Sequence, residues 1–437
     1  MFRITQYMRE LAQAQASGVY PEPLRRAAAV PASGAPAARD SSSAVGRRAA
    51  AGRHARGPVV IWNLIRRYNL TCKHCYAQSA DHEYAGELST QEVLRTLDDL
   101  KAAGVPALIL SGGEPLLRPD FFEIAQRAKE RGFHVSLSSN GTLIDQPMAD
   151  RIAAFGFDYV GVSLDGLKAT HDKFRRLEGA FDLSLAGVRL LHARGIKVGL
   201  RYTMTALNGH DFPALLELMR TEGAQKFYFS HLNYAGRGNI HRGKDAHHIA
   251  TREAMELLFD RTWDAAVRGL DEEYVTGNND ADGPYLLLWL HKRQPELHAR
   301  FGIDLRRRLV AWGGNSSGVN VANIDNLGHV HPDTMWWHHD LGSVRERQFG
   351  EIWADTRDPL MAGLKAKPRR VGGRCAGCRD FDICGGNTRV RAQQLSGDTW
   401  GEDPGCYLLD EEIGVAPSSD QPATTVRRVI PLEVHDA

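Results

Sequence analysis

Apolar runs and amphipathic stretches alternate along the chain from residue 58 to about residue 231. Six apolar runs predict strands, near 58–63, 105–111, 133–139, 158–164, 196–203 and 225–231. Helical patterns lie between them, near 89–103, 119–131, 145–156, 182–194 and 211–222. Ser89 and Glu92 predict a capping box at the start of the first of these helices. Strands separated by helices at this spacing pair in parallel through right-handed crossovers. The pattern therefore predicts an α/β fold, a partial (βα)6 barrel of the TIM type.

The segments outside this region divide the chain further. Residues 1–20 predict an N-terminal helix, with Ile4, Met8 and Leu11 on one face. Residues 21–57, rich in Ala, Pro and Arg, predict a flexible linker. The predicted barrel spans 58–235 and is followed by a helical segment at 236–318. Residues 319–412 predict a small cysteine-rich α+β extension, and residues 413–437 predict a tail.

Polar and glycine-rich residues directly follow five of the predicted strands. The runs are SGGEP at 111–115, SSNG at 138–141, SLDG at 163–166, RYT at 201–203 and SH at 230–231. Because the carboxyl ends of parallel strands share one rim, where ligands bind, we expect these residues to lie together.

The six cysteines fall into two groups. Cys72 and Cys75 are separated by two residues, a spacing that lets both sulfurs grip one metal centre or that simply leaves two buried thiols close together. The late group combines a tight pair with two further thiols, which suits one 4Fe-4S cluster or a structural zinc ion. Its members are Cys375, Cys378, Cys384 and Cys406.

Composition excludes several other classes of protein. The 54 Lys and Arg residues nearly balance the 53 Asp and Glu residues, so no global charge drives binding to nucleic acid or to an anionic membrane. No apolar run approaches the roughly 20 residues that cross a bilayer. The N-terminal residues lack the apolar stretch of a signal peptide, which favours the cytoplasm, where thiols stay reduced and serve as metal ligands.

The loop YNLTCKHC at 68–75 resembles the cluster loop CxxxCxxC of radical S-adenosylmethionine (SAM) enzymes. In that family three cysteines hold a 4Fe-4S cluster whose fourth iron binds SAM. Two of the three positions fall on Cys72 and Cys75, but the first falls on Tyr68. Since phenolate replaces thiolate poorly in a site of soft ligands, the sequence predicts an impaired catalytic cluster.

The resemblance covers residues 58 to about 235 and implies roles for the rim. Glu114 would receive the ammonium group of SAM, and the glycines before it would allow close approach of the backbone. The family's reaction cleaves SAM reductively to a 5'-deoxyadenosyl radical, with electrons from a reductant such as flavodoxin or ferredoxin. The implied cofactor-binding residues are His74, Gly112, Gly113, Glu114, Ser139, Asn140, Ser163, Asp165 and Arg201.

The extension at 319–412 resembles the SPASM or twitch extension of many radical SAM enzymes. That extension often has a cysteine at the position of Asp333, so we do not expect two auxiliary clusters. The resemblance favours one auxiliary 4Fe-4S cluster, held by the four late cysteines, over zinc.

Longer runs resemble the radical SAM proteins of haem d1 biosynthesis in denitrifying bacteria. Among them are VVIWNLIRR at 59–67 and NTRVRAQQLSGDTWGEDPGCYLLDEEIGV at 387–415. This resemblance implies that the substrate is didecarboxysirohaem, an iron tetrapyrrole, and that it loses two propionate side chains. Arg201, Arg237 and Arg242 are candidate partners for its carboxylates. Candidate iron ligands and stacking faces are His329, His331, His338, His339, Trp336 and Trp337.

Two alternatives remain open from the sequence. Related radical SAM enzymes of the alternative sirohaem-dependent haem pathway share the same architecture. Because of Tyr68, the chain is alternatively a non-catalytic tetrapyrrole-binding or scaffold protein that retains only the auxiliary cluster. Neither a nucleic acid nor a membrane is an expected partner.

Overall fold

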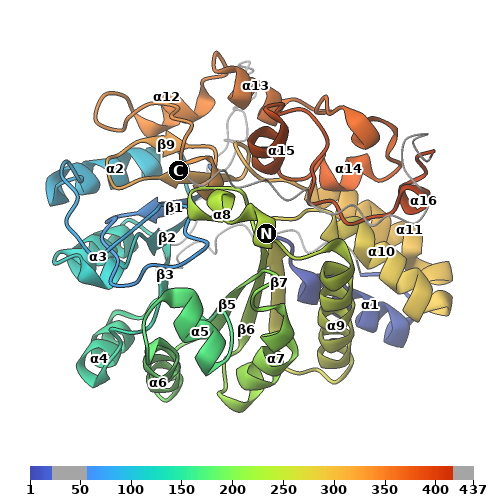
Figure 1. The fold of residues 1–437 in the computed structure, drawn as a ribbon, viewed down its shortest axis with the longest axis horizontal. Helices are drawn as coiled ribbons and strands as arrows, with labels where there is room; N and C mark the ends of the chain where they lie inside the picture. Colours follow the sequence, from blue (N-terminus) through green and yellow to red (C-terminus); the bar gives the residue numbers. More distant parts are fainter. Residues whose placement is uncertain (22–56, 417–437) are drawn as a thin grey trace, which may run out of the picture.

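The structure, a computed structural model, describes residues 1–21 and 57–416 (Figure 1). Almost all of the predicted linker and most of the predicted tail therefore lie outside the described residues. The strands are β1 (Val59–Asn63), β2 (Ala107–Ser111), β3 (His134–Ser139), β4 (Tyr159–Ser163), β5 (Val198–Met204), β6 (Lys226–His231), β7 (Glu273–Gly277), β8 (Val321–Ile324) and β9 (Val330–His331).

Helices connect and surround these strands. The first half of the chain contains α1 (Ile4–Ser17), α2 (Thr90–Ala102), α3 (Phe121–Glu130), α4 (Gln146–Phe155), α5 (Lys168–Arg175), α6 (Ala180–His192) and α7 (Phe212–Thr221). The second half contains α8 (Arg237–Ile240), α9 (His248–Val267), α10 (Asp282–Arg293), α11 (Pro295–Trp312), α12 (Phe349–Ala354), α13 (Pro359–Lys365), α14 (Phe381–Cys384), α15 (Arg389–Ser396) and α16 (Asp410–Ile413).

Among the described residues, nine strands form one sheet in the order β7-β6-β5-β4-β3-β2-β1-β8-β9. Every neighbouring pair is parallel except β8 and β9. The predicted α/β fold and its six strands are confirmed. The expected capping box at Ser89 and Glu92 also begins α2.

The sheet is wider than the sequence predicted. The strand β7 lies in the segment 236–318, which was expected to be helical, and it extends the sheet beyond β6. At the other edge, β8 from the cysteine-rich extension pairs in parallel with β1, so the extension continues the barrel sheet. Both strands are short and lie between long helical or loop segments, which leaves little apolar periodicity to detect.

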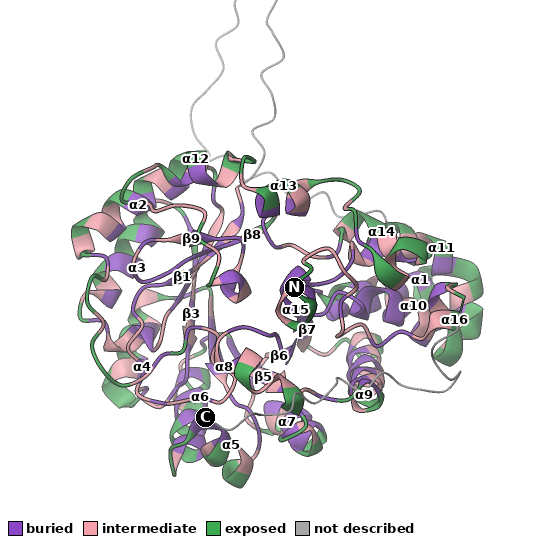
Figure 2. Ribbon diagram, turned by 45° about the horizontal axis from the view of Figure 1, so that its top comes forward, coloured by how far each residue is buried: buried purple, intermediate pink, exposed green. Residues whose placement is uncertain are grey.

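Successive side chains on each strand point alternately into a packed hydrophobic layer and into a hollow centre. On β2, Leu108 and Leu110 are fully buried in the hydrophobic core, while Ala107, Ile109 and Ser111 line a central cavity. Figure 2 shows the strands and the inward sides of the helices buried, whereas the outward sides are exposed. Burying each such leucine contributes about 1.5–3 kcal/mol, which holds the rim residues in place.

The predicted N-terminal helix is present as α1 and packs against α9, α11 and β7. Phe2, two residues before α1, pairs with the edge strand β7. Its N–H donates to the carbonyl of Thr276 at 2.7 Å, and the N–H of Thr276 donates to the carbonyl of Phe2 at 2.8 Å. This contact covers an edge that would otherwise expose unpaired backbone groups.

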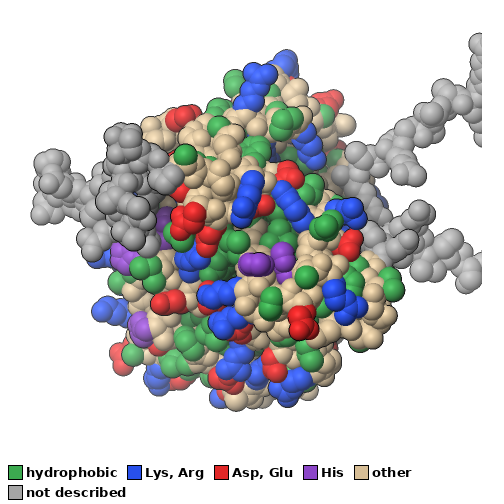
Figure 3. All heavy atoms as spheres, turned by 90° about the vertical axis from the view of Figure 1, so that its right-hand side faces the viewer, with side chains coloured by type: hydrophobic (Ala, Val, Ile, Leu, Met, Phe, Trp, Pro, Cys, Tyr) green, Lys and Arg blue, Asp and Glu red, His purple; other side chains and the backbone are tan. Residues whose placement is uncertain are grey.

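The outer surface carries mixed charge. Figure 3 shows Lys and Arg side chains interspersed with Asp and Glu on the face that includes α10 and α11. On it Arg306 donates to Asp382 at 2.9 Å and Arg293 pairs with Glu256 at 3.3 Å. Within the described ranges no helix is both long and apolar enough to span a bilayer.

A buried ion pair attaches the extension to the barrel. Arg391 on α15 is 1% exposed and donates to both carboxylate oxygens of Asp403, at 2.9 and 2.8 Å. The same guanidinium donates to the carbonyls of Leu232 and Asn278, which follow β6 and β7. One side chain therefore joins the cysteine-rich segment to the rim of the barrel.

We expect Arg391→Met to lower the free energy of unfolding by about 3–5 kcal/mol, because it leaves the Asp403 carboxylate buried without its partner. Denaturant unfolding followed by circular dichroism measures the loss. The matched control is Arg268→Met, which breaks an exposed pair with Asp264 and is expected to cost at most about 1 kcal/mol. Equal losses in the two variants would show that the buried pair has no special role.

Candidate functional site

The five predicted rim segments line one cavity. Its volume is about 1470 Å³, and it runs from the cysteine loop after β1 through the lumen of the sheet. Residues from all five segments therefore lie together, as the sequence predicted. They are Ser111, Gly112, Gly113, Ser138, Ser139, Asn140, Ser163, Asp165, Arg201, Thr203, Ser230 and His231. Cys72, His74 and Cys75 line the same cavity. Since pockets for a single small ligand measure about 300–1000 Å³, this one has room for two.

The loop after β1 is held from α8. The Arg237 side chain donates to the carbonyl of Cys72 at 2.7 Å, and its backbone N–H donates to the carbonyl of Cys75 at 2.9 Å. Arg237 is therefore a support of the loop and does not line the cavity. Arg242 donates to Asn239 at 2.7 Å and does not line the cavity either. The expectation that these two arginines face a substrate is wrong.

Tyr68 occupies the position of the first cluster cysteine. Its side chain is buried against Leu70 and Cys72, and its hydroxyl lies 3.7 Å from the Cys72 thiol. Arg175 on α5 donates to the Tyr68 oxygen at 2.9 Å and to the Cys72 sulfur at 3.2 Å, and it also pairs with Asp165. Burial raises the pKa of Tyr68 well above its usual value, so its phenol stays protonated.

This set of groups does not fit a cluster held by three thiolates. Cys72 and Cys75 supply two sulfurs, and the third group is a protonated phenol already bonded to Arg175. Hard oxygen is a weak ligand in such a site. In residues 1–21 and 57–416, no three His, Cys, Asp or Glu side chains are grouped so that they could hold one metal ion.

Glu114 is fully buried behind the rim and lies within a ring of donors. Ser139 donates its hydroxyl to the carboxylate at 2.9 Å, and the backbone N–H groups of Asn140 and Leu116 donate at 2.8 and 3.3 Å. Burial nevertheless raises the pKa of Glu114 to about 7. The carboxyl group therefore changes protonation state near neutral pH, and only its ionised form attracts a cationic ligand.

The two glycines before Glu114 have a different structural role from the one expected. A Cβ atom at Gly113 would lie 2.0 Å from the carbonyl oxygen of Arg67, and one at Gly112 would lie 2.5 Å from that of Ile65. The N–H of Gly113 donates to Ile65 at 2.6 Å. The close approach that the missing side chains permit is therefore to the cysteine loop itself.

Asp165, at the end of β4, is engaged by protein groups. Its carboxylate is 1% exposed, pairs with Arg175 and accepts the backbone N–H of Thr203 at 3.0 Å. His74 packs against Phe174, with ring centroids 4.9 Å apart, and its Nδ1 atom is buried without a hydrogen-bond partner. Burial lowers the pKa of His74 to about 4, so the ring is neutral and offers a hydrogen-bonding atom to a ligand.

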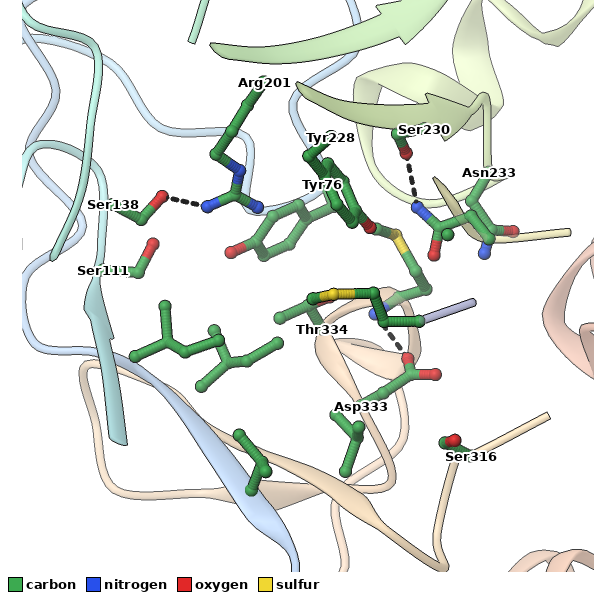
Figure 4. A pocket seen from close by; sticks show the side chains of 18 of the residues that line it. Tyr76, Ser111, Ser138, Arg201, Tyr228, Ser230, Asn233, Ser316, Asp333 and Thr334 are labelled. Atoms are coloured by element: carbon green, nitrogen blue, oxygen red, sulfur yellow. Dashed lines mark hydrogen bonds between the residues drawn. The ribbon is translucent and has the colours of Figure 1, made fainter. Parts of the chain in front are cut away.

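Arg201 points into the lumen from β5. Its guanidinium donates to the Ser138 hydroxyl, and its Cζ atom lies 5.3 Å from the centroid of the Tyr228 ring (Figure 4). Tyr76 lies beside it, with a hydroxyl that accepts from Asn63 at 2.9 Å. The sequence analysis missed both tyrosines, although Tyr76 directly follows Cys75 and Tyr228 takes an inward position in the alternation of β6.

The four late cysteines lie within electrostatic range of one another. Among the described residues, however, no three of them are placed so that they could hold one metal ion. Burial raises the pKa of all four thiols, a cost that binding of a metal would offset.

The histidine and tryptophan candidates of the extension lie away from the cavity. None of His329, His331, His338, His339, Trp336 and Trp337 lines it. Three of the histidines already have partners among carboxylates, His329 with Asp340, His331 with Asp325 and His339 with Asp358. The fourth, His338, bonds to Gln393 at 2.8 Å. Their proposed contact with a substrate iron is not supported.

Comparison with known proteins places this site in a family. The radical SAM superfamily matches residues 62–221. The pre-heme d1 synthase of Dinoroseobacter shibae is 53% identical over 382 residues, or 86% of this chain and 93% of that protein. The Fe-coproporphyrin III synthase of Methanosarcina barkeri is 45% identical, over 82% of this chain and 89% of that protein.

The fold has a solved counterpart. The crystal structure of Streptococcus suis SuiB bound to S-adenosylmethionine superposes with a TM-score of 0.62, over 81% of this chain and 78% of that one, at 17% identity. The overlap supports the barrel and its extension as one architecture. With relatives this similar over nearly their whole length, the chain belongs to the radical SAM superfamily.

Proposed function

We propose that the chain acts in haem d1 biosynthesis, in the step that removes two propionate side chains from didecarboxysirohaem. The observation that carries the proposal is the 53% identity to a pre-heme d1 synthase across 93% of that protein. A cavity of about 1470 Å³ supports it, because SAM alone would leave most of that space unfilled. Radical SAM enzymes rely on a 4Fe-4S cluster, SAM and a reductant such as flavodoxin or ferredoxin.

The residues in and behind the cavity wall have roles that do not depend on the cluster of the loop. Glu114 would receive the ammonium group of SAM within its ring of donors, and the orphaned Nδ1 of His74 would bond to the same ligand. Ser139, Asn140 and Ser163 would complete that side of the cavity. Asp165 would hold Arg175 and, through it, the cysteine loop. The four late cysteines would hold an auxiliary 4Fe-4S cluster.

One observation favours a second function. Because Tyr68 and Arg175 take up the place of the first thiolate, the chain as it stands suits a protein that binds a tetrapyrrole without cleaving SAM. A third candidate, a step of the alternative haem pathway, has the weaker support of 45% identity to an Fe-coproporphyrin III synthase.

The iron content separates the first two functions. Anaerobic reconstitution is expected to give about four irons per chain, all in the extension, and SAM cleavage near background. Tyr68→Cys is expected to raise the iron content to about eight and to bring cleavage above background. Iron and sulfide assays measure the content, and chromatography of 5'-deoxyadenosine measures the cleavage.

The control for this experiment is Tyr84→Cys, which adds a thiol outside the loop and is expected to leave the iron content unchanged. A wild-type chain with about eight irons and normal cleavage would show that a phenol is tolerated at position 68. If Tyr68→Cys has the same iron content and SAM cleavage as the wild type, the defect lies elsewhere.

The substrate is tested with the Tyr68→Cys variant. Incubation with didecarboxysirohaem, SAM and a reductant is expected to yield a tetrapyrrole that has lost two side chains, which mass spectrometry detects. An unchanged mass for didecarboxysirohaem, combined with conversion of an iron coproporphyrin, would replace the haem d1 proposal by the alternative haem pathway.

Binding of SAM is expected to depend on pH through Glu114. Below a pKa of about 7 the carboxyl group holds a proton that an incoming ammonium group must displace, so affinity falls as pH decreases. Calorimetry is expected to show a loss of about tenfold between pH 7.5 and pH 6, while His74, with a pKa of about 4, stays neutral. Glu114→Gln should bind more weakly and nearly independently of pH. If the affinity of Glu114→Gln for SAM still falls as pH decreases, a group other than Glu114 is titrating.

A further inference from the structure

Arg201 is a cation without an acidic partner inside the cavity. Its interactions among the described residues are the hydrogen bond to Ser138 and the ring contact with Tyr228. Two other arginines that line the cavity are neutralised, Arg175 by Asp165 and Arg308 by Glu10. A half-buried guanidinium with free N–H groups in a cavity is suited to an anion that comes with a ligand.

The sheet makes room for this side chain. Gly161 lies on β4 beside β5, and a Cβ atom at that position would lie 2.7 Å from Cδ of Arg201. Any other residue at position 161 would displace the arginine from its path into the lumen. In Figure 4 the guanidinium reaches Ser138 on one side, and the phenol rings of Tyr76 and Tyr228 lie together on the other. The guanidinium is therefore positioned before a ligand arrives.

The Arg201 site is separate from the Glu114 site. Arg201 bonds to Ser138, whereas Glu114 bonds to Ser139. Ser138 and Ser139 both line the cavity, but consecutive side chains leave a strand in opposite directions, so Arg201 and Glu114 bond to β3 at different points. The ammonium and carboxylate groups of one amino acid share a single carbon atom, and they reach both points poorly.

The cavity also has an acidic side. Asp280 and Asp333 line it, and Tyr228 is in electrostatic range of both, as well as of Arg201. Burial raises the pKa of both carboxyl groups, so neither attracts a ligand cation strongly, and neither pairs with Arg201.

We propose that Arg201 binds a propionate carboxylate of the tetrapyrrole, beside Tyr76 and Tyr228, and that it does not bind the carboxylate of SAM. The inference rests on the proposed function for the class of ligand. It reassigns Arg201 from cofactor binding to recognition and orientation of the substrate.

The experiment compares two probes on the full-length protein. One is didecarboxysirohaem, and the other is the same macrocycle with its carboxylates converted to amides. Absorbance titrations give the affinity of each, and calorimetry gives the affinity for SAM. The variants are Arg201→Met, Arg201→Lys, and Arg308→Gln as the control, because Arg308 is already neutralised by Glu10. Thermal unfolding verifies that each variant is folded.

The wild type is expected to prefer the acid to the amide by about tenfold or more. Arg201→Met should lose that preference and bind the acid about tenfold more weakly, with SAM affinity unchanged within about twofold. Arg201→Lys, which keeps the charge without the planar fork, should retain part of the preference. Arg308→Gln should behave as the wild type.

Two results would overturn this inference and leave the proposed function standing. One is an Arg201→Met variant that keeps the acid preference, and the other is a variant that loses SAM affinity about tenfold instead. If Arg201→Met fails to fold, loss of the preference in Arg201→Lys supports the inference, and full retention overturns it. Failure of the wild type to bind either macrocycle would overturn the proposed function and this inference with it.

Discussion

The buried pair between Arg175 and Asp165 organises the mouth of the barrel. Arg175 is 4% exposed, and Asp165 is 1% exposed, so neither charge is tolerable there without the other. Through Asp165 the pair is joined to the end of β4 and, by the N–H of Thr203, to β5. Arg175 also donates hydrogen bonds to the Tyr68 hydroxyl and to the Cys72 sulfur, so the ion pair is joined to the cysteine loop. The shape of the cysteine loop thus depends on an ion pair between α5 and the end of β4.

The two cysteine sites differ in how far their surroundings serve a metal. In the extension, four thiols lie within electrostatic range of one another, and burial raises the pKa of each. In the loop, Arg175 satisfies a phenol and a thiol directly, and the protein itself fills the space that a third sulfur would occupy.

Much of the fold could be predicted from the chain, and specific residues show where prediction stopped. Periodicity located the six central strands, and Ser89 with Glu92 marked the start of α2. The strand β7 was missed because five residues between two long helices carry little pattern. Glu114, Ser139 and Asn140 were found through their motifs, and the structure joins them directly. Tyr228 and Gly161 had no motif, since their roles come from which face of a strand they occupy.

Pairings distant in sequence set further limits on prediction. Neither the attachment of β8 to β1 nor that of Phe2 to Thr276 leaves a local signal. The histidines at 329, 331, 338 and 339 were reasonable candidates from composition, yet each is satisfied within the extension. Spatial partners, and not residue types, decided their role.

The pairing of β1 with β8 has a consequence for how the chain is made. Val59 and Val321 are neighbours in the sheet although 262 residues separate them. During synthesis the barrel strands emerge long before their last neighbour, so one side of β1 stays open while more than half of the chain is still being translated. A nascent protein of this design exposes an apolar strand edge to the cell for many seconds, and chaperones that shield such edges would govern its yield.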